Sequence, residues 1–229
     1  MTYILTNLRN KFFMRKVSIL IFMMGLVGLV TSCCTKTDSA TVVDEKQVVV
    51  DNMLGRRSIR AYKETPVPKE IMDVILNCGI NAPNGMNKQP WEIRVVSNEE
   101  YLKGISDLQK ENMDPNSPHN PFNEPGFRNI FRNAPTVVFI ATDSGMCSQV
   151  DCGLLAGNMV NTAWAYGIGS CIQMGPIRFM KTDVAKPYVD KLGFSDGYEL
   201  LMAIGFGYPD ESPDAKPRDN SKIQYLFED

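Results

Sequence analysis

The sequence predicts a sandwich of the α/β or α+β class, in which helices pack around one β-sheet. Two observations carry this prediction: apolar and β-branched runs of strand length recur along the chain, and segments of helical periodicity separate them. No internal repeat is visible, and the 197 residues from Cys33 onward (229 − 32) are a comfortable length for a single domain. The expected strands are 91–96, 135–141, 171–174 and 198–207, with an aromatic candidate at 223–227, and the expected helices are 42–54, 69–78, 99–110 and 147–166.

Apolar spacing and end residues predict the first two helices. The helix at 42–54 can end at Gly55 and has one apolar face, formed by Val48, Val49, Met53 and Leu54. The helix at 69–78 follows Pro68 and has apolar residues at core spacing, namely Ile71, Val74, Ile75 and Cys78. Both are therefore expected to pack one face against the rest of the domain.

Two later segments are expected to lie at the centre of the fold. Residues 147–166 are small and apolar nearly all round, which is typical of a deeply buried helix. Residues 135–141 form a β-branched run, which favours a central strand. The Pro-, Asn- and Gly-rich residues 111–127 are expected to form a loop.

The first 32 residues have the layout of a secretory signal. Residues 1–16 contain four basic residues and no acidic one, and residues 17–30 are apolar or Gly except Ser18. An apolar run of about 14 residues is too short for a comfortable transmembrane helix. The run ends in Val-Thr-Ser-Cys at 30–33, which resembles the lipobox of bacterial lipoproteins.

The lipobox resemblance divides the chain into three parts. Residues 1–32 would be a signal peptide, residues 33–46 a polar tether that begins at a lipidated Cys33, and residues 47–229 the folded domain. The protein is then expected on the bacterial cell envelope, anchored to the membrane by lipid and facing the periplasm or the cell surface. An uncleaved anchor and a signal with ordinary cleavage stay open, as does the choice of Met1 or Met14 as the start.

The charge balance argues against nucleic-acid binding. All four basic residues before Cys33 leave with the signal, so 20 basic residues remain against 26 acidic ones and the net charge falls from −2 to −6. A domain of this sign has no general attraction for phosphate backbones.

Cysteine and histidine usage excludes other classes of site. The cysteines show no CxxC pair and no zinc-like spacing, so no metal site is expected. Cys78, Cys152 and Cys171 lie in apolar stretches and are expected to be buried. The one histidine, His119, lies in a proline-rich loop, whereas Ser–His–Asp hydrolysis needs a rigidly placed histidine. A cofactor is therefore expected to supply the reactive atom.

Three clusters have the chemistry of a binding site. Arg56, Ser58 and Arg60 alternate, so in an extended segment they share one side and can bind a phosphate, although a solvated basic turn would look the same. The loop 82–91 (APNGMNKQPW) offers amide and amine groups to a flat heterocycle, although such loops are common. The glycines of 167–176 (GIGSCIQMGP) allow close backbone approach or simply a tight turn.

The order and spacing of these clusters closely resemble the nitroreductase family of FMN enzymes. The match includes RRSIRAY at 56–62, APNGMNKQPW at 82–91, GIGSC at 167–171 and KPR at 216–218, and it covers about residues 48–229. Asn84 stands where the family usually has Ser. The resemblance implies an α+β nitroreductase-like sandwich with a central, mostly antiparallel sheet flanked by helices. It also implies a domain-swapped homodimer whose two subunits share each flavin.

By this resemblance the cofactor is FMN. The first cluster, with Lys216 and Arg218, would hold the phosphate and the pyrimidine side of the ring. The loop at 83–85 would come from the partner subunit, and the backbone at 174–176 would reach ring atom N5. The cofactor-binding residues that the resemblance implies are Arg56, Arg57, Ser58, Arg60, Pro83, Asn84, Gly85, Asn87, Gln89, Met174, Gly175, Pro176, Lys216 and Arg218.

The implied function is two-electron, ping-pong hydride transfer through FMN from NAD(P)H or another donor. The acceptor would be a nitroaromatic, a quinone, an enone or a similar small molecule. FMN carries the reaction, so no catalytic side chain is expected. NAD(P)H is scarce outside the cytoplasm, which leaves the donor of an exported enzyme open.

The substrate lid is expected in 111–132, formed by Phe122, Phe127, Arg128 and Phe131, although these residues could equally be ordinary packing. The alternative to an enzyme is a non-enzymatic envelope lipoprotein that binds a flavin or another ligand in the same cleft.

Overall fold

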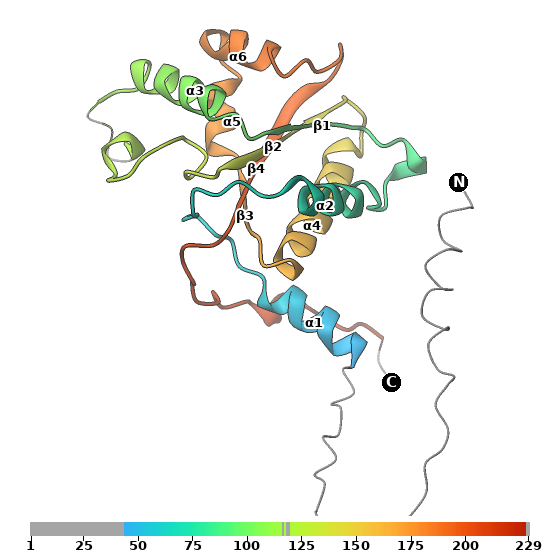
Figure 1. Cartoon of the computed structure of the whole chain (residues 1–229). Coiled ribbons are helices and arrows are strands. Elements are labelled where there is room, and N and C mark those ends of the chain that lie inside the picture. Colours follow the sequence, from blue (N-terminus) through green and yellow to red (C-terminus); the bar gives the residue numbers. More distant parts are fainter. Residues whose placement is uncertain (1–43, 116, 118–119, 228–229) are drawn as a thin grey trace, which may run out of the picture. The chain divides into compact units, whose positions relative to one another are not determined.

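The structure is a computed structural model that describes residues 44–115, 117 and 120–227. Residues 43–229 form one compact unit, whose elements are shown in Figure 1. The expected signal, the lipidation site Cys33, nearly all of the tether and His119 lie outside the described residues. No helix in the described ranges is long and apolar enough to cross a membrane.

The sheet has four antiparallel strands in the order β1-β2-β4-β3. The strands are β1 Trp91–Val96, β2 Thr136–Thr142, β3 Gly169–Gln173 and β4 Glu199–Gly207. All four lie within two residues of the predicted bounds, and the predicted antiparallel sheet is confirmed. Because β1 and β3 are the two outer strands, residues that follow or precede them lie at opposite edges of the sheet.

Helices cover both faces of the sheet (Figure 1). Alternate residues of β2 face opposite sides, as the period of a strand requires. Val138 and Ile140 pack with α2 (Lys69–Ile80) and α4 (Ser148–Ala165), whereas Val137 and Phe139 pack with α3 (Glu99–Glu111) and α5 (Gly175–Met180). The short α6 (Lys186–Asp190) lies beyond α5, and 3-10 turns occur at Gly85–Asn87, Pro121–Asn123, Asp183–Ala185 and Asn220–Lys222.

The first helix, α1, spans Glu45–Gly55 and begins where the Asp44 side chain accepts a hydrogen bond from the backbone N–H of Lys46. The predicted end at Gly55 is confirmed. No residue of this helix is buried, although its apolar face was expected to pack. The four residues that were expected to pack have exposed fractions of 52 to 72%. They are Val48, Val49, Met53 and Leu54.

Two predictions from local pattern are wrong, and one set of elements was missed. Cys78 is exposed, because the buried face of α2 runs through Met72, Ile75 and Gly79 instead. Residues 223–227 form no strand and are largely exposed, since no described strand pairs with them. The short helices between Gly175 and Asp190 were not anticipated. Cys152 and Cys171 are buried, as expected.

Candidate functional site

The arginine cluster lies on an extended segment that joins the end of α1 to the edge strand β3. Ser58 forms a parallel bridge with Ser170, and the Ile59 N–H donates to the Ser170 carbonyl at 3.0 Å. Ile59 is 1% exposed, so the side chains on either side of it point away from the core. Ser58 and Arg60 therefore lie on one side of the segment, as the predicted alternation requires.

The residues after Arg60 pair with the segment that follows β4. The Lys63 N–H donates to the Tyr208 carbonyl and the Asp210 N–H donates to the Ala61 carbonyl, both at 3.0 Å. The Tyr62 hydroxyl donates to the carbonyls of Ile59 and Gly205. These contacts anchor the arginine segment to the sheet from both sides.

Arg57 has a different role from its two neighbouring arginines. Its Nη1 donates to the carbonyls of Leu54, Gly55 and Arg56 at 2.8–3.0 Å. These are the carbonyls that a helix leaves without internal partners at its C-terminus. In the described chain Arg57 therefore caps α1, whereas the Arg60 guanidinium contacts only the nearby Ser58 carbonyl, at 3.2 Å.

The loop at 83–90 is a compact, exposed turn. Met86, Asn87 and Gln89 have positive φ angles of 50–54°. The Asn84 side-chain oxygen accepts from the Gln89 N–H at 2.9 Å, which gives this variant residue a bracing role. Asp151 on α4 also braces the loop, since its carboxylate accepts from the Gly85 N–H at 3.1 Å. Nothing in the sequence pattern indicated Asp151.

The third cluster forms the turn from β3 into α5. Met174 precedes the helix and is half exposed, and Gly175 and Pro176 begin it. The Gln173 side chain is buried and donates from Nε2 to the Phe131 carbonyl at 2.9 Å. This contact holds the residues after Phe131 against β3.

Two charged residues that the motifs did not include join the arginine segment. Arg132, with φ of 58°, follows Phe131. The Glu211 carboxylate accepts from the backbone N–H groups of Arg60 and Ala61. Burial is the main cause that raises the pKa of the Cys171 thiol. The positive charges of Arg60, Arg132 and Arg56 act to lower this pKa, and the negative charge of Glu211 acts to raise it. All four charges therefore act at β3.

The remaining predicted residues fall into two groups. Lys216 and Arg218 are exposed, and Arg218 Nη1 donates to the carbonyls of Lys216 and Pro217 in its own segment. Phe131 is completely buried and packs edge-to-face on Phe139, so it belongs to the core rather than to a lid.

The other three expected lid residues are at least partly packed. The rings of Phe122 and Phe127 contact each other, with centroids 4.8 Å apart. Both pack against the core on the face of the sheet that α3 and α5 cover. Arg128 pairs with Glu64 at 2.9 Å and donates to the Tyr62 carbonyl at 3.1 Å. These contacts fit ordinary packing, the alternative that the sequence left open.

The clusters do not converge within one chain. The arginine segment and the β3–α5 turn lie at the β3 edge, whereas the 83–90 loop leads into β1 at the opposite edge. Three strand spacings separate these edges, which is about 14 Å. The described chain therefore presents two separate half-sites.

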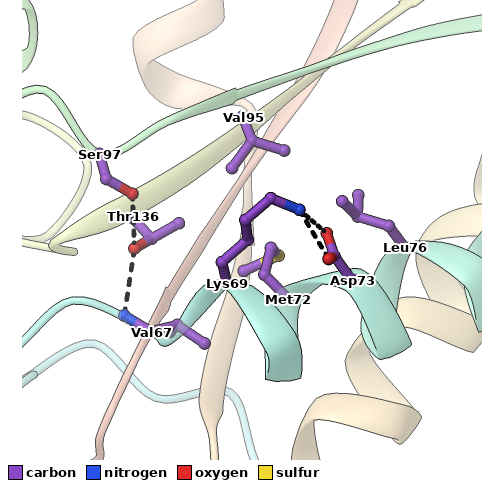
Figure 2. Close-up of a pocket in the computed structure, with 8 residues that line it drawn as sticks. All are labelled: Val67, Lys69, Met72, Asp73, Leu76, Val95, Ser97 and Thr136. Atoms are coloured by element: carbon purple, nitrogen blue, oxygen red, sulfur yellow. Dashed lines mark hydrogen bonds and ion pairs between the residues drawn. The ribbon is translucent and has the colours of Figure 1, made fainter.

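A pocket of about 370 Å³ lies apart from both half-sites, between α2 and the β1 edge (Figure 2). Its walls are largely apolar, and the Lys69–Asp73 ion pair at 2.6 Å crosses it. Thr136 accepts from the Val67 N–H at 3.4 Å and contacts Ser97 at 3.0 Å. None of the residues that line the pocket is a predicted site residue. They are Val67, Lys69, Met72, Asp73, Leu76, Val95, Ser97 and Thr136.

Comparison with known proteins identifies the family. Residues 53–208, more than half of the chain, match the sequence model described as the nitroreductase family. The chain belongs to the nitroreductase family. Members of this family are flavin oxidoreductases, so the resemblance seen in the three motifs is confirmed at that level.

Individual relatives match most of the chain. YfhC of Bacillus subtilis, a candidate NAD(P)H nitroreductase, is 28% identical over 189 residues, which cover 77% of this chain and 92% of YfhC. A nitroreductase of Desulfitobacterium hafniense with bound FMN superposes with a TM-score of 0.68 at 26% identity, over 78% of this chain and 97% of that one. NfnB of Mycobacterium smegmatis, an FMN-dependent nitroreductase in complex with NADPH, superposes with a TM-score of 0.59 at 22% identity, over 81% and 100%.

We expect Tyr62→Phe to lower the free energy of unfolding by about 1–3 kcal/mol at pH 8, because two carbonyls lose their buried donor. Burial raises the pKa of Tyr62 well above its usual value of 10.0. The unfolded chain therefore releases this proton above about pH 10 while the folded chain retains it, and stability falls as the pH rises through that range.

Urea unfolding at pH 8 and pH 10.5 measures both effects. The variant should lose less stability between the two pH values than the unchanged protein. Tyr198→Phe, at the start of β4, is the control and should keep the full loss. Equal pH dependence of Tyr62→Phe and the unchanged protein would contradict this account.

Proposed function

We propose that this chain is an FMN-dependent oxidoreductase that reduces a small acceptor by two electrons. The observation that carries the proposal is the arginine segment, which is anchored at Ser170, near the start of the edge strand β3, and places Ser58 and Arg60 on the side opposite the buried Ile59. Family membership and the FMN-bound Desulfitobacterium hafniense structure support it. The NADPH complex of NfnB supports a nicotinamide as one candidate donor.

The residues at the β3 edge fit FMN. Guanidinium groups bind phosphate through two parallel hydrogen bonds, and Arg56 and Arg60 are available on one side of an anchored backbone. The chemistry that FMN supplies when bound is hydride transfer at N5, from NAD(P)H or another donor to a nitroaromatic, quinone, enone or similar acceptor. The chain would orient the ring, and Arg60 would provide positive charge that stabilises the anionic reduced flavin.

The first test is an absorbance spectrum of residues 35–229 after incubation with FMN and desalting. We expect stoichiometric flavin bands that bleach when NADH or NADPH is added. Bound flavin that neither NADH nor NADPH reduces would support a flavoprotein that takes its electrons from another donor. No retained flavin would contradict the proposal and favour a lipoprotein that binds some other ligand.

Arg56→Ala tests the phosphate assignment in the same material. Loss of a charge-assisted hydrogen bond should raise the dissociation constant for FMN about 10- to 100-fold in a fluorescence titration. Lys110→Ala, which removes the same charge near the end of α3, is the matched control and should bind FMN normally.

A homodimer is the assembly that this proposal requires. The two half-sites lie at opposite edges of one sheet, so a second copy must supply the 83–90 loop to the arginine segment. Two apolar surfaces also lack cover in the described chain: the outer face of α1, and the C-terminal residues Ile223, Tyr225, Leu226 and Phe227, which are 64–100% exposed. Reciprocal exchange of the C-terminal segments would make the dimer domain-swapped.

Leu54→Asp tests this assembly, because Leu54 is 72% exposed in the single chain. Burying an unpaired carboxylate at a subunit interface should raise the dimer dissociation constant about 100-fold or more, measured by sedimentation equilibrium. Val184→Asp places the same charge at an exposed valine outside both apolar surfaces and should leave the dimer intact. A monomeric unchanged protein, or a Leu54→Asp dimer of normal affinity, would refute the proposed interface.

We also propose that the chain is exported and lipid-anchored through Cys33. The support is the sequence of residues 1–33, which lie outside the described residues. In a bacterial host, Cys33→Ala should move the protein out of the detergent-soluble membrane fraction and abolish labelling by a fatty acid. Cys34→Ala, one residue further on, should leave both unchanged. Labelling that survives in Cys33→Ala would rule out this anchor.

A further inference from the structure

Glu211 belongs to none of the flavin-binding motifs, yet it makes a direct contact with the arginine segment. Its Oε1 accepts from the N–H of Arg60, in a short contact, and from the N–H of Ala61 at 3.3 Å. Backbone pairing between Ala61–Lys63 and Tyr208–Asp210 stops at this point. The Glu211 carboxylate therefore continues the pairing by one residue, up to Arg60.

The contact uses donors that would otherwise be free to bind an anion. The N–H groups of Arg60 and Ala61 converge on one oxygen atom, and converging backbone N–H groups can bind an anion. Because Glu211 occupies the N–H groups of Arg60 and Ala61, a phosphate or an anionic ring at this edge must be bound by the arginine side chains. The conformation of the Arg60 backbone then decides where its guanidinium lies.

Glu211 also changes the charge at this edge. Its carboxylate acts on the buried Cys171 thiol together with Arg60, Arg132 and Arg56, and with the opposite sign. A negative charge here weakens the attraction of the arginines for an anion. Its hydrogen bonds and its charge therefore have opposite expected effects on a bound flavin.

We propose that Glu211 is a positioning residue, which holds the Arg60 backbone for flavin binding and offsets part of the positive charge beside the ring. The inference rests on the proposed FMN function. If the proposal holds, the affinity for FMN depends on the hydrogen-bond acceptor oxygen of Glu211. The midpoint potential of the bound flavin depends on the negative charge of Glu211.

Two substitutions separate these effects. Glu211→Gln keeps an acceptor oxygen and removes the charge, so FMN should bind with unchanged or higher affinity and its midpoint potential should become more positive. Glu211→Ala removes both, so the dissociation constant for FMN should rise about tenfold, which corresponds to about 1.4 kcal/mol. Asp210→Asn removes a charge from the adjacent residue and should retain the FMN affinity of the unchanged protein.

A double-mutant cycle shows whether Glu211 acts through Arg60. In the Arg60→Ala background, Glu211→Ala should cause little further loss of FMN affinity, because the guanidinium that it positions is absent. Normal FMN affinity in Glu211→Ala, or an equal loss in Glu211→Gln and Glu211→Ala, would overturn the proposal. So would additive losses in the cycle.

One measurement does not depend on FMN at all. In the flavin-free protein, amide hydrogen exchange at Arg60 and Ala61 should be faster in Glu211→Ala than in Glu211→Gln, with the exchange of β4 unchanged. Equal protection in the two variants would refute the positioning role. If the unchanged protein retains no flavin while this difference is present, the proposed function fails and the Glu211 contact stands.

Discussion

The candidate site depends on how one extended segment is anchored. The backbone between Ser58 and Lys63 pairs on one side with β3 at Ser170 and on the other with the residues that follow β4. An extended segment forms no backbone–backbone hydrogen bonds within itself, so its conformation comes from these neighbours. The buried Ile59 side chain and the Tyr62 hydroxyl set its rotation, and the outward direction of the arginines follows from that rotation.

Anchoring by backbone contacts leaves the arginine side chains available for a ligand. Arg57 is used to cap α1, whereas the Arg60 guanidinium donates to the nearby Ser58 carbonyl, its one hydrogen bond within residues 44–115, 117 and 120–227. Positive charge without a buried counter-ion suits an anionic cofactor such as FMN, and the Glu211 carboxylate moderates that charge while it orders the backbone. The chain therefore contributes binding and charge, and the reactive atom belongs to the cofactor.

Sheet topology separates the predicted site residues of one chain into two groups. The order β1-β2-β4-β3 places the 83–90 loop and the arginine segment at opposite edges of the sheet. The exposed apolar face of α1 and the exposed C-terminal residues are of the kind that marks an interaction surface. The proposed dimer would cover these surfaces and would bring the two groups of site residues together.

Local patterns in the sequence were enough to predict the type of nearly every long element, the family, and the common side of Ser58 and Arg60. Periods of 2 and 3.6 residues, turn residues and short motifs are local, so they can be read without a fold. Only the tertiary structure placed Phe131 in the core, exposed Cys78, and brought Asp151, Arg132 and Glu211 to the motifs. These outcomes depend on contacts between residues as far as 151 positions apart, and no local pattern encodes which distant side chain a backbone N–H will meet.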